Sequence, residues 1–361
     1  MFYIEKLKLT NFRCYKDKRI NFKPHVNIIV GENAVGKTSL VEAIYCLGLT
    51  KSYKASKDSF LIKHDQPFYV LEGEFVNQER KHNVLLSYEI DKSRKRLLVD
   101  NNVVKKLSDY IGTFKVVMFS PDDSELIKGY SPQRRRFLDI YLGQINNKYL
   151  KDLSNYNKVL KNRNELLKQT NQSEQDLELL KIYSEALVKY GKNLIIEREK
   201  FINMLNPEVA KISLAISNGE EKTELKYMPN VENEEFMLKT FRQLKKDLYL
   251  QTTGLGPHKD DFLFTIKGVD AASFASQGQQ RTSSIALKLG LASLFDKLGL
   301  DNIVILDDVF SELDKERQNE IMKLFKNNKQ IFITTTTIKA INEELLESSN
   351  VIKIEREEKD E

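Results

Sequence analysis

Residues 26–49 read "VNIIVGENAVGKTSLVEAIYCLGL". A short apolar run of the kind that forms a buried strand stops at Gly31, and apolar residues recur at helical spacing from Leu40 onward. Between them, residues 31–38 match the pattern G-x-x-x-x-G-K-[ST] in the strand–turn–helix context that such a phosphate-binding loop requires. The stretch therefore predicts an α/β fold that binds a nucleotide.

The residue types in this loop suit the chemistry of a triphosphate. The glycines let backbone N–H groups close around the β-phosphate, Lys37 can reach the β- and γ-phosphate oxygens, and the Thr38 hydroxyl can bind Mg²⁺. We expect the nucleotide to be held by Gly31, Glu32, Asn33, Ala34, Val35, Gly36, Lys37, Thr38 and Ser39.

A second stretch, "NIVILDD" at residues 302–308, ends a predicted buried strand in two carboxylates. Ligands of parallel α/β sheets bind beyond the carboxyl ends of the strands. We assign Asp307, with Thr38, to the Mg²⁺ site, and Asp308 to orienting the attacking water as general base. Lys37, Asp307 and Asp308 are thus the predicted catalytic residues. An Asp pair after a strand is otherwise a helix cap or a solvated turn, and only the phosphate loop favours the catalytic interpretation.

The composition is that of a globular protein, with 361 residues and 41% hydrophobic residues. Its net charge of +5 permits a polyanionic partner without requiring one. Cys14 and Cys46 form neither a disulfide framework nor a zinc motif. The apolar runs are too short to cross a membrane, and the N-terminus has no secretion signal. We expect a cytoplasmic protein with no membrane partner.

The two nucleotide motifs lie near opposite ends of the chain, so one sheet must be assembled from both ends around a large insertion. Strand-like pieces from 68 to 119, ending in "FKVVMF", predict a small antiparallel sheet. Residues 122–250 are mostly helical in pattern, and two arms of about 20 to 25 residues predict a helical hairpin around "KQTNQSE" at 168–174. Core packing is the favoured explanation of their apolar stripes.

Further motifs occur in one order along nearly the whole chain: "LTNFRCY" (9–15), "LVEAIY" (40–45), "PQRRRFLD" (132–139), "GPHKDD" (256–261), "SQGQQRT" (276–282), "LDDVFSELD" (306–314) and "FITTT" (332–336). Together with the phosphate loop, they resemble the ABC-type ATPases of the SMC class and, within that class, the RecF family of bacterial DNA replication and repair proteins. Ala34 in the loop is typical of that family.

The resemblance implies an ABC-type ATPase head, a mixed sheet assembled from both chain ends with flanking helices, plus an inserted helical lobe with a short hairpin. We expect residues 1–120 to form the N-terminal part of the head, 121–250 the helical lobe, and 251–361 the C-terminal part of the head.

"SQGQQRT" takes the place of the signature motif, which in such ATPases faces the γ-phosphate of ATP bound by a second subunit. The resemblance implies this role in trans for Ser276, Gln277, Gly278 and Gln279, with the helix after Arg281 aiming its N-terminus at the partner's nucleotide. Taken alone, the stretch is more often an ordinary capped helix.

Other positions follow the family less closely. Ser311 and Asp314 fall in the D-loop, although "SELD" also suits a helix cap. Thr335 and Thr336 replace the usual switch His as sensors of the γ-phosphate. Asp308 stands where most relatives carry Glu, so we expect slow turnover. A clear Q-loop Gln is missing after "VVMF" at 116–119.

The implied function is ATP-dependent DNA binding with ATP and Mg²⁺ as cofactors. An ATP-dependent homodimer would clamp double-stranded DNA near gapped junctions, slow DNA-stimulated ATP hydrolysis would release it, and the protein would support RecA loading with RecO and RecR. The predicted DNA contacts are Arg134, Arg135, Arg136, Lys54 and Lys57, with Lys51 beside them. For each, a solvated surface position is equally plausible.

Two alternatives stay open: an ATPase subunit of an ABC transporter, and a DNA-binding scaffold that uses the nucleotide as a switch without significant turnover. "GPHKDD", with Lys259, could serve either the nucleotide or the packing of the lobe.

Overall fold

A computed structural model describes residues 1–169, 173–310, 315–324 and 329–356 of the chain. The chain divides into two compact units. Unit 1 comprises Met1–Asp123, Ala215–Gly219 and Ile285–Glu361, and unit 2 comprises Ser124–Leu214 and Glu220–Ser284. In the described part, no helix combines the length and apolar character needed to cross a bilayer.

The centre of unit 1 is a five-stranded parallel sheet in the order β14-β3-β13-β12-β8. Its strands are β3 (Val26–Val30), β8 (Lys115–Phe119), β12 (Asn302–Asp307), β13 (Ile331–Thr335) and β14 (Asn350–Lys353). β12 and β13 are buried along their whole length, as apolar strands of a parallel sheet are. The predicted assembly of one sheet from both chain ends is confirmed.

A second sheet of unit 1 is antiparallel, in the order β2-β1-β4-β5-β6-β7. Its strands are β1 (Phe2–Phe12), β2 (Tyr15–Asn21), β4 (Phe68–Asn77), β5 (Arg80–Glu89), β6 (Arg94–Val99) and β7 (Asn102–Val103). The prediction that "FKVVMF" belongs to this sheet was wrong. Those residues form β8, which pairs in parallel with β12, because four of its five side chains are buried and it lacks the polar face of an antiparallel edge.

One helix joins the two sheets of unit 1. The α-helices that lie wholly in the described part of this unit are α1 (Lys37–Leu49), α2 (Leu107–Tyr110), α11 (Lys315–Leu324) and α12 (Glu343–Glu347). α1 contacts β1, β4 and β5 on one side and β8, β12 and β13 on the other. Eleven of its thirteen residues are buried, so the helix that follows the phosphate loop is fixed between the two sheets.

Unit 2 combines helices with a small antiparallel sheet in the order β11-β10-β9. Its elements are α3 (Glu125–Lys128), α4 (Ser131–Ile145), α5 (Asn147–Gln169), α6 (Glu174–Ile216), β9 (Thr223–Met228), α7 (Phe236–Arg242), α8 (Leu244–Leu250), β10 (Asp261–Ile266), β11 (Val269–Asp270), α9 (Ala271–Phe274) and the first residues of α10 (Gln277–Lys297), most of which belongs to unit 1. The division between the units falls within the last residues of α6 and after Ser284 in α10. Residues 122–250 are mostly helical, as predicted, and β9 is a strand within this range that the sequence analysis did not identify.

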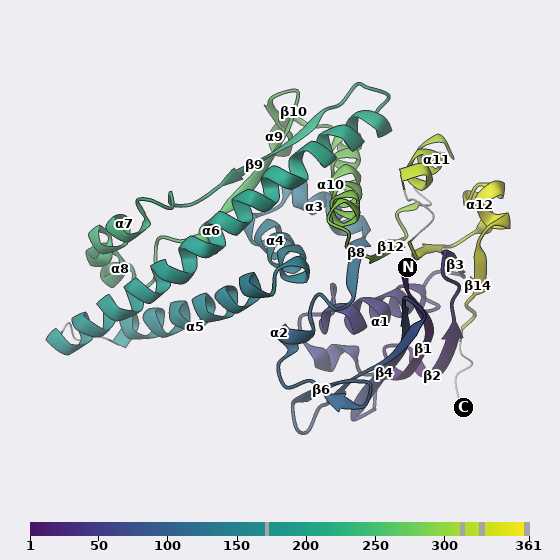
Figure 1. Cartoon of the computed structure of the whole chain (residues 1–361), viewed down its shortest axis with the longest axis horizontal. Coiled ribbons are helices and arrows are strands. Elements are labelled where there is room, and N and C mark those ends of the chain that lie inside the picture. The colour runs from purple at the N-terminus through teal and green to yellow at the C-terminus, as the bar shows by residue number, and fades with distance from the viewer. Residues whose placement is uncertain (170–172, 311–314, 325–328, 357–361) are drawn as a thin grey trace. The chain divides into compact units, whose positions relative to one another are not determined.

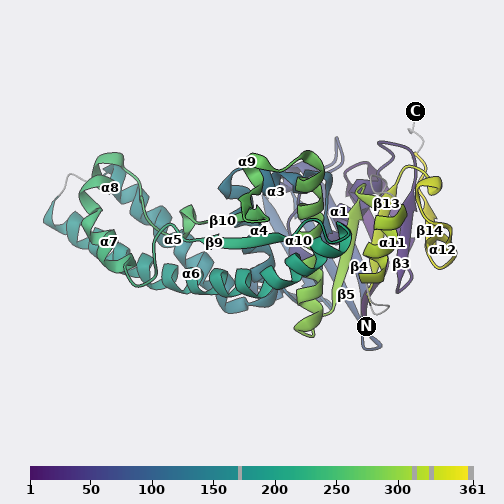
Figure 2. The ribbon, with the colours of Figure 1, turned by 90° about the horizontal axis from the view of Figure 1, so that it is seen from above.

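The predicted hairpin is formed by α5 and α6, which run side by side (Figures 1 and 2). The Asn193 side chain donates to Asp152 across the hairpin at 3.0 Å. Tyr156, Leu187 and Phe201, which belong to the apolar stripes of the two arms, are buried, in agreement with core packing. The predicted length of the second arm was wrong. α6 has 43 residues and continues through Pro207, because apolar side chains keep their helical spacing beyond the expected end: Ile202, Leu205, Val209 and Ile212 are all buried.

Candidate nucleotide-binding site

The phosphate loop connects β3 to α1 in unit 1, and two of its glycines are required by close approach. A Cβ atom on Gly31 would lie 2.3 Å from the Ile354 carbonyl oxygen that follows β14. Gly36 has a φ of 109°, and a Cβ there would lie 2.7 Å from both the Cys14 sulfur and the Tyr15 hydroxyl. The G-x-x-x-x-G spacing thus places glycine where backbone and neighbouring side chains leave no room for another residue.

Lys37, the first residue of α1, bends back over this loop. Its Nζ atom donates to the carbonyl oxygens of Gly31 and Glu32, both at 2.7 Å. Burial lowers the pKa of the Lys37 ammonium, and the carboxylates of Asp308 and Asp307 act in the opposite direction. The ammonium therefore lies within the loop, with two carboxylates nearby.

Asp307, the last residue of β12, is at the centre of a set of polar contacts. Its Oδ1 atom accepts from the hydroxyls of Thr38 at 3.1 Å and Thr334 at 2.9 Å. Its Oδ2 atom accepts from the Tyr53 hydroxyl at 2.8 Å and lies 3.5 Å from the Lys54 ammonium. The structure thus brings Thr38 and Asp307 together, as predicted. It adds Tyr53, which sequence reasoning missed, and Thr334, which belongs to the "FITTT" motif but was not expected at Asp307.

The pair formed by Thr38 and Asp307 fits Mg²⁺ in its chemistry. Both offer oxygen atoms, which Mg²⁺ prefers, and this ion is usually held by only one or two protein oxygens plus phosphates and water. Consistent with that mode, the described residues contain no cluster of three or more His, Cys, Asp or Glu side chains suited to hold a metal alone.

Asp308 and the threonines at the end of β13 lie beside this pair. Asp308 has a φ of 58° and donates its backbone N–H to the Thr334 hydroxyl at 2.9 Å. Of the two predicted switch residues, Thr335 is buried and its hydroxyl donates to the Thr337 carbonyl at 3.1 Å, whereas Thr336 is exposed. Thr334, one residue earlier, is the threonine that contacts both carboxylate residues.

The signature stretch forms the first turn of α10 in unit 2. The prediction that the helix begins after Arg281 was wrong, since it starts at Gln277. The Ser276 hydroxyl accepts from the Gln279 N–H at 3.2 Å, and the Gln279 side chain accepts from the Ser276 N–H at 3.0 Å. This reciprocal capping box satisfies two end N–H groups and draws Gln277, Gly278 and Gln279 into the helix. Ser311 and Asp314 of the predicted D-loop lie outside the described residues.

The arginines predicted to contact DNA have other partners in unit 2. Arg134 is only 7% exposed and donates to both carboxylate oxygens of Asp261, at 2.6 and 2.8 Å. This burial argues against a surface role for Arg134. Arg135 donates to the Asp260 carbonyl at 2.7 Å, and Arg136 is exposed. In unit 1, Lys54 lies at Asp307, while Lys51 and Lys57 are exposed.

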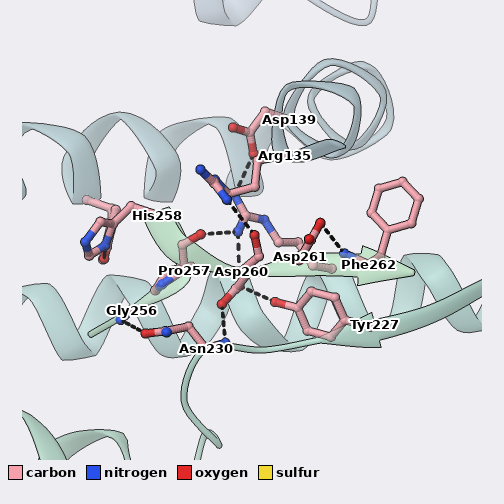
Figure 3. A network of polar contacts seen from close by, with 12 residues as sticks. Arg135, Asp139, Tyr227, Asn230, Gly256, Pro257, His258, Asp260, Asp261 and Phe262 are labelled. Carbon is pink, nitrogen blue, oxygen red and sulfur yellow. Dashed lines mark hydrogen bonds and ion pairs between the residues drawn. The ribbon is translucent and has the colours of Figure 1, made fainter. Parts of the chain in front are cut away.

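"GPHKDD" belongs to a buried polar network in unit 2, which Figure 3 shows from close by. Asp260 accepts from Arg198 at 3.1 Å, from the Asn230 N–H at 2.8 Å and from the Tyr227 hydroxyl. His258 contacts the Tyr156 hydroxyl at 2.6 Å. These contacts favour the packing role for the motif over the nucleotide role, with Lys259 exposed beside it.

Three features define an ABC-type, SMC-like ATPase head. They are the phosphate loop before a buried helix, the carboxylate at the end of β12, and the parallel sheet built from both chain ends. The family model described as "RecF/RecN/SMC N terminal domain" matches residues 3–360. The chain belongs to this family and, within it, to the RecF proteins of DNA replication and repair.

Individual relatives agree with this assignment. The chain is 37% identical to the DNA replication and repair protein RecF of Bacillus cytotoxicus over 363 residues, which cover 98% of this chain and 96% of the relative. The solved structure of the recombination mediator protein RecF-ATP in the RecFOR pathway superimposes with a TM-score of 0.87 at 34% identity, over 93% of this chain and 92% of that one. The Smc head domain derived from Pyrococcus furiosus has a TM-score of 0.54 at 17% identity, over 93% and 90% of the two chains, and shares the fold.

Proposed function

We propose that the protein is an ATP-dependent DNA-binding mediator of recombination, two copies of which close around a pair of ATP molecules. The observation that carries this proposal is the hydrogen bond between Thr38 and Asp307, two residues from opposite ends of the chain, beside Lys37 in the phosphate loop. A weak ATPase activity and a cytoplasmic location, with no membrane partner, belong to the same proposal.

In the proposed reaction, the loop N–H groups and Lys37 bind the β- and γ-phosphates. Thr38 and Asp307 would hold Mg²⁺, which supplies charge neutralisation at the phosphate oxygens. Asp308 accepts a proton from the attacking water, the bond between the γ-phosphorus and the bridging oxygen breaks, and ADP and phosphate leave. The exposed Thr336 hydroxyl is a better candidate than the buried Thr335 for sensing the γ-phosphate.

The second half of each site comes from the other copy. Ser276 lies exposed and Gln279 half-buried at the N-terminus of α10, a helix of 21 residues. Backbone N–H groups and the positive end of a helix dipole attract an anion there. An ATP molecule bound by both copies stabilises the dimer by mass action, and hydrolysis weakens it. Ser311 and Asp314 would contact the partner from the D-loop.

Duplex DNA, particularly at gapped junctions, is the proposed ligand of the closed dimer. Arg136 and Lys57 are exposed cations suited to phosphate contacts that do not depend on sequence, and Lys51 adds a third. Because a solved relative is described as a mediator in the RecFOR pathway, we extend the proposal to RecR as partner, with RecO, and to loading of RecA.

One observation favours a second function, a nucleotide-switched scaffold with little turnover. The candidate base is Asp308, one methylene shorter than Glu, on a backbone with positive φ. Loss of steady-state hydrolysis in Asp308→Asn would favour the enzyme, and an already negligible wild-type rate would favour the scaffold.

Light scattering and DNA binding test the main proposal. We expect a monomer with ADP, a dimer with ATP or a non-hydrolysable analogue, and tight duplex binding only in the second case. With about three phosphate contacts from each of the two copies, affinity should fall about 10³-fold between about 50 and 200 mM salt. Ser276→Ala should reduce dimerisation, whereas Ser273→Ala on α9 is the matched control. A protein that stays monomeric when saturated with the analogue, or binds DNA equally in every nucleotide state, would contradict the proposal.

A further inference from the structure

The segment that follows α1 is closed into a tight turn by a serine. Thr50 ends the helix with a φ of 58°, and its N–H donates to the Cys46 carbonyl at 2.7 Å. The Ser52 hydroxyl oxygen then accepts the backbone N–H groups of Lys54 at 2.9 Å and Ala55 at 2.7 Å. Two consecutive N–H groups on one side chain fix the backbone on either side of Tyr53.

This turn is fastened to α1 through Glu42. The Ser52 hydroxyl donates to Oε1 of Glu42, a side chain that is only 1% exposed. Arg13 donates two parallel hydrogen bonds to the same carboxylate, from Nε to Oε2 at 2.8 Å and from Nη2 to Oε1 at 2.9 Å. Such bidentate pairs are geometrically strict as well as strong. Glu42 thereby links the N-terminal sheet, the helix of the phosphate loop and the turn.

The turn delivers the Tyr53 hydroxyl to Asp307. The Tyr53 ring packs edge-on against Tyr45 of α1, with centroids 5.3 Å apart and an interplanar angle of 70°. Burial, followed by the charge of Asp307, raises the pKa of Tyr53, so the hydroxyl keeps its proton and acts as a donor. Its bond to Oδ2 of Asp307 measures 2.8 Å.

The acceptor positions of Asp307 are thereby shared among four donors. Oδ1 faces Thr38 and Thr334, and Oδ2 faces Tyr53 and Lys54. A carboxylate offers about four lone-pair positions in all. Nucleotide-bound Mg²⁺, or a water molecule on it, needs one of these positions. Oδ1 is already bonded to Thr38 of the phosphate loop, so Oδ2 is the oxygen that would have to become available.

We propose that Tyr53 is a positioning residue whose hydroxyl holds the turn at 50–55 on Oδ2 of Asp307 and gives up that oxygen when ATP binds with its metal. The inference rests on the proposed nucleotide site and adds a residue to it. Binding of the metal–nucleotide pair is then coupled to the position of the turn, which carries Lys51 and Lys54, with Lys57 close by in the sequence.

The test compares ATP affinity with and without metal in two matched variants. Tyr53→Phe removes the hydroxyl and keeps the ring, while Tyr45→Phe makes the same change in the other ring of the pair. Because the hydroxyl no longer competes, Tyr53→Phe should bind ATP about tenfold more tightly than wild type in Mg²⁺, the ratio expected from one hydrogen bond to a charged group. Affinity in EDTA should be unchanged, and Tyr45→Phe should behave as wild type in both.

Titration calorimetry gives the ATP affinity in Mg²⁺ and in EDTA. If Tyr53 had only a structural role, the ratio of these two affinities would be the same in Tyr53→Phe and in wild type. An equal ratio in Tyr53→Phe and wild type, or weaker Mg–ATP binding by Tyr53→Phe, would overturn the inference. Hydrogen exchange supplies a second measurement: the amides of Lys54 and Ala55 should lose protection when wild type binds Mg–ATP, and unchanged or increased protection would also overturn it. If wild type binds no ATP at all, the proposed function fails instead.

Discussion

Replacing Asp260 by Asn should weaken unit 2 and leave the nucleotide site as it is. Asp260 is fully buried and accepts hydrogen bonds from Arg198, from the Asn230 N–H and from Tyr227. The amide retains the volume of the carboxylate but removes its charge, and one of its two polar atoms becomes a donor that faces other donors. If "GPHKDD" serves packing, this substitution should lower the free energy of unfolding of unit 2.

The magnitude follows from the exposure of the ion-paired groups. Arg198 has a side chain that is 2% exposed, and its remaining carboxylate partner, Asp139, is 29% exposed. Removing one partner of a buried ion pair costs about 3–5 kcal/mol. With an m-value of about 3 kcal/mol/M, the urea midpoint of unit 2 should fall by about 1 to 1.7 M.

Urea unfolding followed by hydrogen exchange of peptides from each unit is the appropriate assay, because a chain with two units need not unfold in one step. Glu224→Gln is the matched control in the same unit. Glu224 pairs with Lys222 at 2.6 Å, but the two side chains are 39% and 51% exposed. Such surface pairs contribute about 0–1 kcal/mol, so the control should lie close to wild type.

Two results would refute the reasoning. One is a midpoint shift below about 0.3 M for Asp260→Asn, which corresponds to less than about 1 kcal/mol. The other is a loss of ATP affinity without a loss of stability, which would return "GPHKDD" to the nucleotide site.

Two further predictions concern Lys37 and His258. Lys37→Arg keeps the charge but not the compact ammonium that fits between the Gly31 and Glu32 carbonyls. ATP hydrolysis should therefore drop, while the dimer fraction with ATP, measured by light scattering, stays near that of wild type. An unchanged rate of hydrolysis in this variant would contradict the assigned site. Burial lowers the pKa of His258 to about 4, below its value of about 6.5 in the unfolded chain, so its contribution is complete above pH 6.5 and is lost as the pH falls toward 4. Between pH 7.5 and 5 the free energy of unfolding should fall by about 2 kcal/mol through this group, and His258→Asn should flatten that slope in pH-dependent denaturation; an unchanged slope would exclude the effect.

The parallel sheet could be predicted from sequence because its signals are local. The runs that became β3, β12 and β13 are short and apolar, β3 ends at a glycine and β12 in an aspartate, and the phosphate loop fixes the order of strand and helix. The membership of β8 could not be read in this way, because "KVVMF" suits either sheet and only its pairing with β12 decides.

The site was predictable where a motif has fixed spacing and not where the contact joins distant segments. Thr38 and Asp307 carry motif signals, whereas Tyr53 is an unremarkable tyrosine in the sequence, and only the turn built on Ser52 brings it to Asp307. Arg134 illustrates the converse. Three adjacent arginines indicate a charged surface, yet α4 turns the first of them inward to Asp261.

The pairing of β3 with β13 on one side and β14 on the other has a consequence for synthesis on the ribosome. Both neighbours of this strand are translated last, so the phosphate loop leaves the exit tunnel long before the backbone that supports it exists. Contacts between residues so far apart in sequence form slowly. During synthesis the apolar strand β3 is therefore exposed without β13 and β14 beside it. A premature stop codon between the phosphate loop and β12 would therefore yield a polypeptide that retains "GENAVGKT" in full and yet has no Asp307 to complete the pocket.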